Sequence, residues 1–422
     1  MRGVRTLWLA LAAFGLSTLS LAVGSPAVMA KSGGPPITLC QISATSGVDV
    51  VLGQNDIPAV KAYVKYVNSH GGVLGRKYKL VEENDSSSPS QAASLVRKCV
   101  VQDRANFILG PEETATMAAA VPVADSLRTV LITQGSGWDQ GGVSSSDIRS
   151  YAFPGLYDVF YIDDLDTAAR IIAPQHLTRV GVIEDAVPGG LPNGGYMQYL
   201  CKTYHCNVVG VQKVQPGQTD DTPQVLNLLA AKPQVIVLGS IPGPDQLTTI
   251  KAIRAQNQTI PVSECSVCWT PGFVEAAGGA GVLHNVYTRA SIPELLHHLP
   301  NTAANRPIIS QIKTYESGVT AAGYGTPEDL NNLAPAWVEG QELTAAIKKA
   351  GSTDEKAVKQ ALAHQKVETL DTFWNRTPKN YSGLKKVVDV TETWNSSGQT
   401  VPIGPAGPEP MIGGEQLAKV SG

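Results

Sequence analysis

The chain has 422 residues, of which 43% are hydrophobic and 16% charged, and its formal net charge at pH 7 is −3. This length exceeds one ordinary hydrophobic core and indicates about two lobes. The mildly acidic balance provides no basic stripe of the kind that nucleic-acid binding requires, so we expect no nucleic-acid partner.

Residues 1–30 have the pattern of a cleaved signal peptide. Arg2 and Arg5 precede an apolar stretch at 7–23, and residues 28–30 form a small-x-small cleavage site. The alternative is a retained membrane anchor, but alanine, glycine and serine interrupt the apolar stretch and no stop-transfer charges follow. No cysteine stands at the cleavage point, which argues against a lipoprotein. We therefore predict an exported protein, periplasmic or extracellular, whose formal charge changes from −3 to −5 when the two arginines are removed.

Strand-like and helix-like segments alternate after the leader. The first series of strands is predicted at 37–42, 78–82, 106–109 and 129–133, with helices at 56–69, 90–103 and 114–126. In the first helix Val60, Tyr63, Val64 and Val67 recur at helical spacing, and glycines at 71–72 end it.

A second series of strands is predicted at 179–184, 207–211, 234–238 and 260–263, with helices at 163–173, 195–204, 222–231 and 246–256. A strand at 286–289 precedes three helices at 306–317, 332–350 and 353–363, and residues 385–394 alternate polar and apolar like a half-exposed strand. Such alternation favours parallel sheets with right-handed crossovers, so the fold class is α/β with doubly wound, Rossmann-like lobes.

All six cysteines lie outside the leader, and export implies an oxidising compartment. Six cysteines allow fifteen pairings. Two pairs are close in sequence, Cys201 with Cys206 and Cys265 with Cys268, which leaves Cys40 with Cys99. In a doubly wound sheet, the helix that carries Cys99 would cover the strand that carries Cys40.

The Cys265–Cys268 spacing has two alternative interpretations. A redox motif would open a helix directly after a strand, whereas here Trp269 follows the pair and Pro271-Gly272 breaks the chain, so a structural loop disulfide is favoured. A zinc site would need further ligands at related spacing, and the sequence has none. We expect no metal and no cofactor.

No motif in the sequence indicates catalysis. Gly135-Ser136-Gly137 lacks the spacing of a nucleophile elbow, and Glu112-Glu113 are adjacent residues that we expect to face different ways. The chain is therefore not expected to be an enzyme. The alternative, an exported hydrolase, would need a nucleophile and a base brought together from distant loops.

Residues 67–111 resemble the first lobe of the periplasmic amino-acid-binding proteins of the leucine/isoleucine/valine type. The resemblance rests on Asn68 ahead of the Gly71-Gly72-x-x-Gly75-Arg76 turn, on the charged strand after it, and on Asp85 ahead of Pro89-x-x-Ala92. It continues at Gly110, at 180–184 and at the turn 394–398, and so covers nearly the whole mature chain.

The resemblance implies a periplasmic binding protein of type I, with two lobes joined by three hinge crossovers near Tyr157, Thr288 and residues 369–375. The expected N-terminal lobe spans 37–157 and 289–370, the C-terminal lobe 158–288 and 371–403, and residues 404–422 are a flexible tail. The implied function is capture of a small molecule and its delivery to the membrane permease of an ABC transporter, by a monomer. A sensor that docks on a signalling partner without transport is the alternative.

Ligands of such sheets bind at the carboxyl ends of the strands. Ser46 lies in the first strand-end loop, and Gly135, Ser136 and Gly137 follow the fourth strand, where glycines let the backbone approach a ligand. The first turn at Thr114 would present unpaired N–H groups to a carboxylate. The alternative role of Thr114 is to cap its helix. The resemblance implies that Thr114, Gly135 and Gly137 hold the carboxylate and amino ends of the ligand.

The resemblance also implies an acidic residue in the second lobe, close to Ser266, with Glu264 two residues earlier. Leu52 and Ile241 stand about where the family has aromatic residues. Unless Glu264 or Asp139 supplies the missing charge, the site should not prefer a zwitterionic amino acid, because an unpaired buried ammonium is costly. Aromatic residues that could stack on an apolar or aromatic acid, or else only pack in the core or rim, are Trp138, Tyr157 and Trp269.

Overall fold

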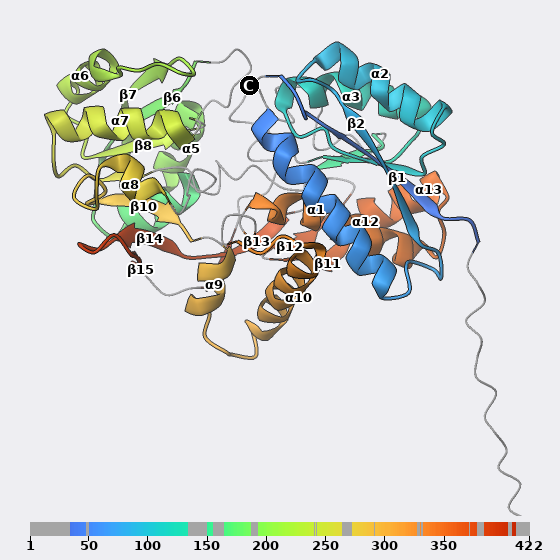
Figure 1. Cartoon of the computed structure of the whole chain (residues 1–422). Coiled ribbons are helices and arrows are strands. Elements are labelled where there is room, and N and C mark those ends of the chain that lie inside the picture. The colour runs from blue at the N-terminus through green and yellow to red at the C-terminus, as the bar shows by residue number, and fades with distance from the viewer. Residues whose placement is uncertain are drawn as a thin grey trace, which may run out of the picture.

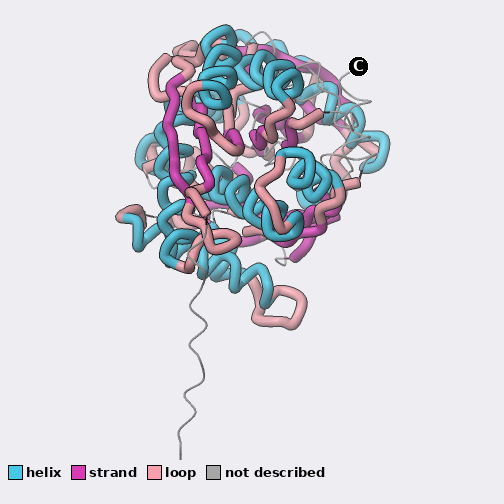
Figure 2. Tube along the Cα trace, turned by 90° about the vertical axis from the view of Figure 1, so that its right-hand side faces the viewer, coloured by secondary structure: helices cyan, strands magenta, loops and turns pink. Residues whose placement is uncertain are grey.

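The computed structural model describes residues 34–47, 50–133, 150–154, 164–186, 193–239, 241, 243–263, 272–290, 292–326, 330, 332–370, 372–377, 384–403 and 407–410. They form two α/β lobes (Figure 1), and the helices pack around the strands, as the second view also shows (Figure 2). Among these residues, no helix combines the length and apolar character needed to cross a bilayer. The predicted signal peptide lies outside them.

The first lobe contains a parallel sheet of five strands in the order β2-β1-β3-β4-β5. The strands are β1 (Ile37–Ser43), β2 (Tyr78–Asn84), β3 (Phe107–Leu109), β4 (Leu131–Thr133) and β5 (Ala152–Pro154). Side chains of β1 alternate between two cores, because Leu39 packs with helix α1 (Val50–Ser69) whereas Cys40 packs with α2 (Pro89–Val101) and α3 (Thr114–Leu127). The sheet is therefore covered on both faces.

Among the elements with described bounds, four helices from the later part of the chain return to this lobe. They are α9 (Ile292–His298), α10 (Arg306–Ala322), α12 (Ala334–Ala350) and α13 (Glu355–Ala363). Trp337 of α12 is fully buried and meets the rings of Tyr63 and Tyr315 edge-on, with centroids 5.0 and 5.3 Å away. This aromatic cluster joins α1, α10 and α12 into one layer.

The second lobe contains seven strands in the order β15-β14-β10-β9-β8-β6-β7. The strands are β6 (Arg179–Asp185), β7 (Asn207–Val214), β8 (Val235–Gly239), β9 (Val262–Ser263), β10 (Val286–Arg289), β14 (Thr391–Trp394) and β15 (Thr400–Pro402). Helices α6 (Thr222–Ala230), α7 (Gly243–Gln256) and α8 (Phe273–Ala277) contribute to one core, and η1 (Thr167–Ile172) and α5 (Asn193–Tyr204) to the other. Both lobes are therefore doubly wound, as predicted.

A third sheet has the order β11-β12-β13-β16 and is antiparallel. Its strands are β11 (Lys366–Glu368), β12 (Thr372–Asn375), β13 (Leu384–Asp389) and β16 (Gly407–Pro410). The predicted single strand at 385–394 is wrong: it is two strands in different sheets, β13 and β14, separated at Val390. Residues 407–410 of the expected flexible tail pair with β13.

Before β15 the chain passes between the lobes three times, between β5 and η1, between β10 and α9, and between β13 and β14; after β15 it returns to the third sheet at β16. Trp374 and Val390 both belong to the first-lobe core, which favours a third crossover near Val390 instead of the expected 369–375. The exact lobe boundaries stay a proposal.

The structure contains two of the predicted disulfides. Cys40 is bonded to Cys99, with Cα atoms 6.0 Å apart, and Cys201 is bonded to Cys206, with Cα atoms 4.4 Å apart. The first joins β1 to α2, as the topology argument expected. Cys265 and Cys268 lie outside the described residues.

Candidate functional site

The loops after β1 and β2 are bonded to each other at the carboxyl ends of the strands. The Thr45 amide donates to Asn84 Oδ1 at 2.9 Å, and Asn84 Nδ2 donates to Ser46 Oγ at 2.8 Å. Gly47 has a φ of +98°, and a Cβ there would lie 2.5 Å from the Ser86 carbonyl oxygen, so only glycine fits. These contacts fix the exposed Ser46 hydroxyl at the edge where a ligand is expected; its role in binding stays a prediction.

A cluster of buried carboxyl groups lies beneath this loop. Glu112, after β3, accepts a hydrogen bond from the Ala44 amide at 3.1 Å. Burial raises the pKa of Glu112 well above its ordinary value, and the nearby Asp56 and Asp85 raise it further. Gly53 of α1 packs against the other side of Ala44. A Cβ at Gly53 would lie only 2.3 Å from the Ala44 carbonyl oxygen, so no larger residue fits there. Ala44 is thus held from two sides, at the start of the loop 44–47, which we call the first-lobe wall.

The start of α3 differs from the prediction in one respect. The residue that caps it is Glu113, whose two carboxylate oxygens accept from the Ala115 and Thr116 amides at 2.8 Å. Thr114 is the first helical residue, not the cap, and its side chain lies outside the described residues. Two of the N–H groups that we expected to be free for a ligand carboxylate are therefore already occupied. Glutamate is an uncommon cap, which is why the sequence pointed to Thr114.

The corresponding strand ends of the second lobe are also polar. Glu184, at the end of β6, is 5% exposed; it accepts from the Gly194 amide at 2.9 Å and pairs with Lys213 at 3.3 Å. Ser263 of β9 is hydrogen-bonded to Thr167 of η1. Ile241 is 1% exposed and packs in the second-lobe core. Its expected contact with the ligand stays a prediction.

Several residues that we expected to contact the ligand lie outside the part of the chain that the structure describes. The side chain of Leu52 on α1 is among them. The others, outside the described residues altogether, are Gly135, Ser136, Gly137, Trp138, Asp139, Tyr157, Glu264, Ser266 and Trp269. Among the described residues, one group of potential metal ligands is close enough together to hold an ion. It consists of Cys40, Cys99 and Asp103, and its two cysteines are bonded to each other in a disulfide.

Direct side-chain contacts join the two lobes near the crossovers. His298 Nε2 of α9 lies 2.9 Å from Glu392 Oε1 of β14, and Thr400 Oγ1 of β15 donates to Glu294 Oε1 of α9 at 2.6 Å. Burial raises the pKa of Glu392 to about 8, and the adjacent Glu294 adds to the shift. Helix α9 is thus hydrogen-bonded to the β14–β15 hairpin of the other lobe.

These two doubly wound lobes, three crossovers and polar strand ends agree with the comparison to known proteins. A family model described as periplasmic binding protein matches residues 36–388. The chain belongs to this family. Proteins of the family bind solutes and are typically not enzymes.

Relatives of this binding protein include an amino acid binding protein of Pseudomonas aeruginosa, 22% identical over 394 residues, which cover 90% of this chain and 96% of that protein. The Leu/Ile/Val-binding protein BraC3 of Rhizobium johnstonii is 24% identical over 356 residues, or 79% of this chain and 92% of that protein. The family model confirms the predicted periplasmic binding protein family, and relatives named for binding Leu, Ile and Val resemble the chain over most of its length.

Solved structures show the same fold. An extracellular ligand-binding receptor from Rhodopseudomonas palustris HaA2 has a TM-score of 0.71 at 18% identity and covers 87% of this chain and 99% of its own. The substrate-binding protein LivJ from Streptococcus pneumoniae, in complex with isoleucine, has a TM-score of 0.65 at 17% identity, with 89% and 100% covered. These likenesses confirm the type I periplasmic binding fold.

Proposed function

We propose that this protein is an exported solute receptor that captures a small molecule between its lobes and delivers it to the permease of an ABC transporter. The proposal rests mainly on the polar edge of the first lobe. There the loops after two parallel strands are joined by a hydrogen bond between Asn84 and Ser46. The second lobe has polar strand ends of its own, at Glu184 and Ser263. Relatives named as Leu/Ile/Val-binding proteins support the same function.

The ligand proposed is an amino acid or a related carboxylate or amide with an apolar or aromatic body. The carboxylate that would pair with an α-amino group has no counterpart at Ser266, which reduces the expected preference for a zwitterion. The negative charge of Glu113 at the start of α3 also favours a ligand end that donates hydrogen bonds there. A carboxylate and its amide are thus the most informative pair of compounds to compare.

Capture would operate through closure of the lobes. A ligand that touches both lobes stabilises the closed state by its differential affinity for that state. Moving the population from 1:99 to 99:1 requires about 5.5 kcal/mol of such preference. A monomer with three crossovers is suited to this motion, because several parallel connections allow bending while they restrain twist.

A thermal-shift screen of residues 31–422 tests the proposal. The panel holds branched-chain and aromatic amino acids, the matching carboxylates without the amine, and their amides. Because stabilisation grows as RT ln(1 + [L]/Kd), a ligand present at about 100 times its Kd raises stability by about 2.7 kcal/mol. If no member shifts the melting temperature, the proposed ligand class is wrong.

Matched variants then locate the site. Ser46→Ala combined with Thr114→Val should weaken the ligand-induced shift, whereas Ser126→Ala, at the far end of α3, should leave it unchanged. Delivery is tested separately, by uptake of the identified ligand into vesicles that contain the candidate permease. Uptake that does not depend on the added protein would contradict a transport role and would favour the sensor alternative.

A further inference from the structure

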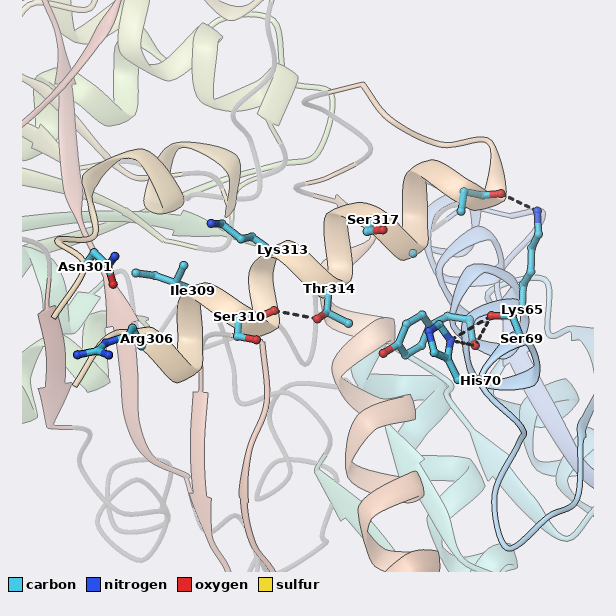
Figure 3. Close-up of a pocket in the computed structure, with 13 residues that line it drawn as sticks. Lys65, Ser69, His70, Asn301, Arg306, Ile309, Ser310, Lys313, Thr314 and Ser317 are labelled. Atoms are coloured by element: carbon cyan, nitrogen blue, oxygen red, sulfur yellow. Dashed lines mark hydrogen bonds between the residues drawn. The ribbon is translucent and has the colours of Figure 1, made fainter. Parts of the chain in front are cut away.

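A groove of about 710 Å³ lies between α1 and α10 (Figure 3). On the α10 side it is lined by small residues, including Ser317, Gly318 and Ala321, and on the α1 side by Tyr66 and His70. Small side chains opposite aromatic ones leave the space between the helices unfilled. Lys65 Nζ, on α1, donates to the Ala321 carbonyl oxygen at 2.6 Å and closes one end.

The groove is distant from the expected solute site. Helix α1 follows the loop that ends β1 and runs back along the sheet, so its last residues lie near the beginning of β2. Consistent with this, Asn68 Nδ2 donates to the Tyr78 carbonyl oxygen at 2.9 Å, and Tyr78 is the first residue of β2. Ser69 and His70 therefore lie at the amino ends of the strands, opposite the carboxyl ends that carry Ser46.

The groove is basic although the protein is acidic overall. Its thirteen lining residues include Lys65, Arg306 and Lys313 and no aspartate or glutamate, in a chain whose net charge is −3. Glu316, one turn after Lys313 on α10, interacts electrostatically with that lysine but is not part of the lining. A ligand with negative charge is therefore complementary to the groove.

The floor of the groove is held in place by the aromatic cluster. The ring of Tyr66 lies 4.4 Å from that of His70 and 5.4 Å from that of Trp337. A Cβ at Gly318 would lie 2.4 Å from Trp337 Cη2, so the glycine sets the depth. These contacts make the groove a preformed feature of the lobe and give it apolar as well as charged surface.

The length of the groove favours an extended ligand. Its α10 lining runs from Arg306 to Ala321, which corresponds to about 22 Å at 1.5 Å per residue. About seven residues of extended chain span that distance. A compact anion would use only one of the cations, because Arg306 and Lys313 are about 10 Å apart along the helix.

We propose that this groove binds an extended, acidic peptide segment of a partner protein. The last twelve residues of the chain itself do not suit it, because they contain one glutamate, Glu415, whose charge Lys419 offsets. The occupant that we propose is therefore another chain, whose carboxylates face Arg306 and Lys313 while its backbone follows α10.

The test uses fluorescence anisotropy with residues 31–422 and a labelled eight-residue peptide of alternating aspartate and alanine. The double variant Arg306→Glu/Lys313→Glu should lose at least about tenfold in affinity at low ionic strength, equivalent to about 1.4 kcal/mol. The control Lys202→Glu/Lys356→Glu makes the same change of net charge on α5 and α13 and should retain the affinity. Equal losses in both variants would overturn the proposal, because they would indicate attraction by net charge alone.

Two further measurements complete the test. Ser317→Trp fills the groove without changing its charge and should also abolish binding, with circular dichroism used to verify folding. A peptide with asparagine in place of aspartate should not bind. If that neutral peptide binds equally well, or if inorganic tripolyphosphate binds as tightly as the acidic peptide, the assignment to an acidic peptide is wrong.

Discussion

Arg376 and Glu342 form an ion pair of 2.7 Å in which neither side chain is exposed to solvent. Arg376 also donates to Gln365 Oε1 at 2.8 Å and to the carbonyl oxygen of Pro154, and its guanidinium lies 4.7 Å from the ring centroid of Trp374. Pro154 is the last residue of β5, immediately before the first crossover. One buried cation thus connects β12, α12 and the start of the hinge.

Loss of this cation should destabilise the protein. Arg376→Met leaves the Glu342 carboxyl buried without its partner, and we expect the free energy of unfolding to fall by about 3 kcal/mol. Burial raises the pKa of Glu342, and Arg376 opposes that shift. Glu342→Gln removes the buried charge, so it should be milder and should restore part of the loss in the double variant. Urea unfolding measures each value. Arg97→Met, an exposed change on α2, is the control; if it costs as much as Arg376→Met, the ion pair has no special role.

The contact between Glu392 and Glu294 should make stability depend on pH. The pKa of Glu392 rises from an ordinary 4.5 to about 8 through burial and the neighbouring carboxyl. Between these values the folded protein keeps a proton that the unfolded chain has lost. The free energy of unfolding therefore falls as the pH rises from about 4.5 to about 8, by up to about 1.4 kcal/mol per pH unit for one proton.

Glu392→Gln tests this dependence, because it removes the titrating group and keeps its size. Unfolding curves recorded across this range should be flatter for the variant than for the natural protein, although Glu355, whose pKa burial also raises to about 8, keeps part of the slope. Glu275→Gln, at an exposed position of α8, should leave the slope unchanged. An unaltered slope in Glu392→Gln would contradict the assignment of the proton.

The sequence was sufficient for the fold because its signals are local. The apolar run at Val235–Gly239 is a fully buried strand, and the helical spacing of Val60 and Tyr63 marks the core face of α1. The Cys40–Cys99 pairing also follows from the order of strands and helices. The switch at Val390 was missed because the alternation of 385–394 continues across it, and alternation does not reveal which sheet a strand joins.

Less of the candidate site could be predicted from the sequence, because its residues are held by contacts between segments that are distant in the chain. Nothing near Ala44 indicates that Glu112, 68 positions later, will hold its amide. Residue preference offers Thr114 either as a ligand contact or as the cap of α3, whereas the residue that reaches both amides is Glu113. The predicted ligand contacts from Gly135 to Ser266 stay predictions.

Glu112 should matter for the position of the first-lobe wall. Glu112→Ala removes the acceptor of the Ala44 amide, and we expect a loss of about 1–3 kcal/mol in the free energy of unfolding together with a weaker ligand response. Glu112→Gln keeps an oxygen for that amide and, since the pKa of the natural carboxyl is raised, should be nearly neutral. Thermal shifts with and without ligand measure both effects. Identical behaviour of the two variants would show that the hydrogen bond does not position the wall.

Glu113 should influence which ligands are accepted. Glu113→Ala removes the cap of α3, at a cost of about 1 kcal/mol, and frees the Ala115 and Thr116 amides. With the negative charge gone, the affinity for a carboxylate ligand should rise relative to that for its amide. Calorimetry with such a pair measures the ratio. A ratio that does not change would place the acidic end of the ligand elsewhere.

Gly318 lies where α10 packs against Trp337, and it should not tolerate a side chain. A Cβ there would be 2.4 Å from the indole ring, which the rings of Tyr63 and Tyr315 hold in place. Gly318→Ala should therefore reduce the free energy of unfolding by about 1–3 kcal/mol. Gly281→Ala is the matched control, because no atom lies within 4 Å of its added Cβ. If both variants unfold at the same urea concentration as the natural protein, α10 can move away from Trp337 and the groove beside it is not preformed.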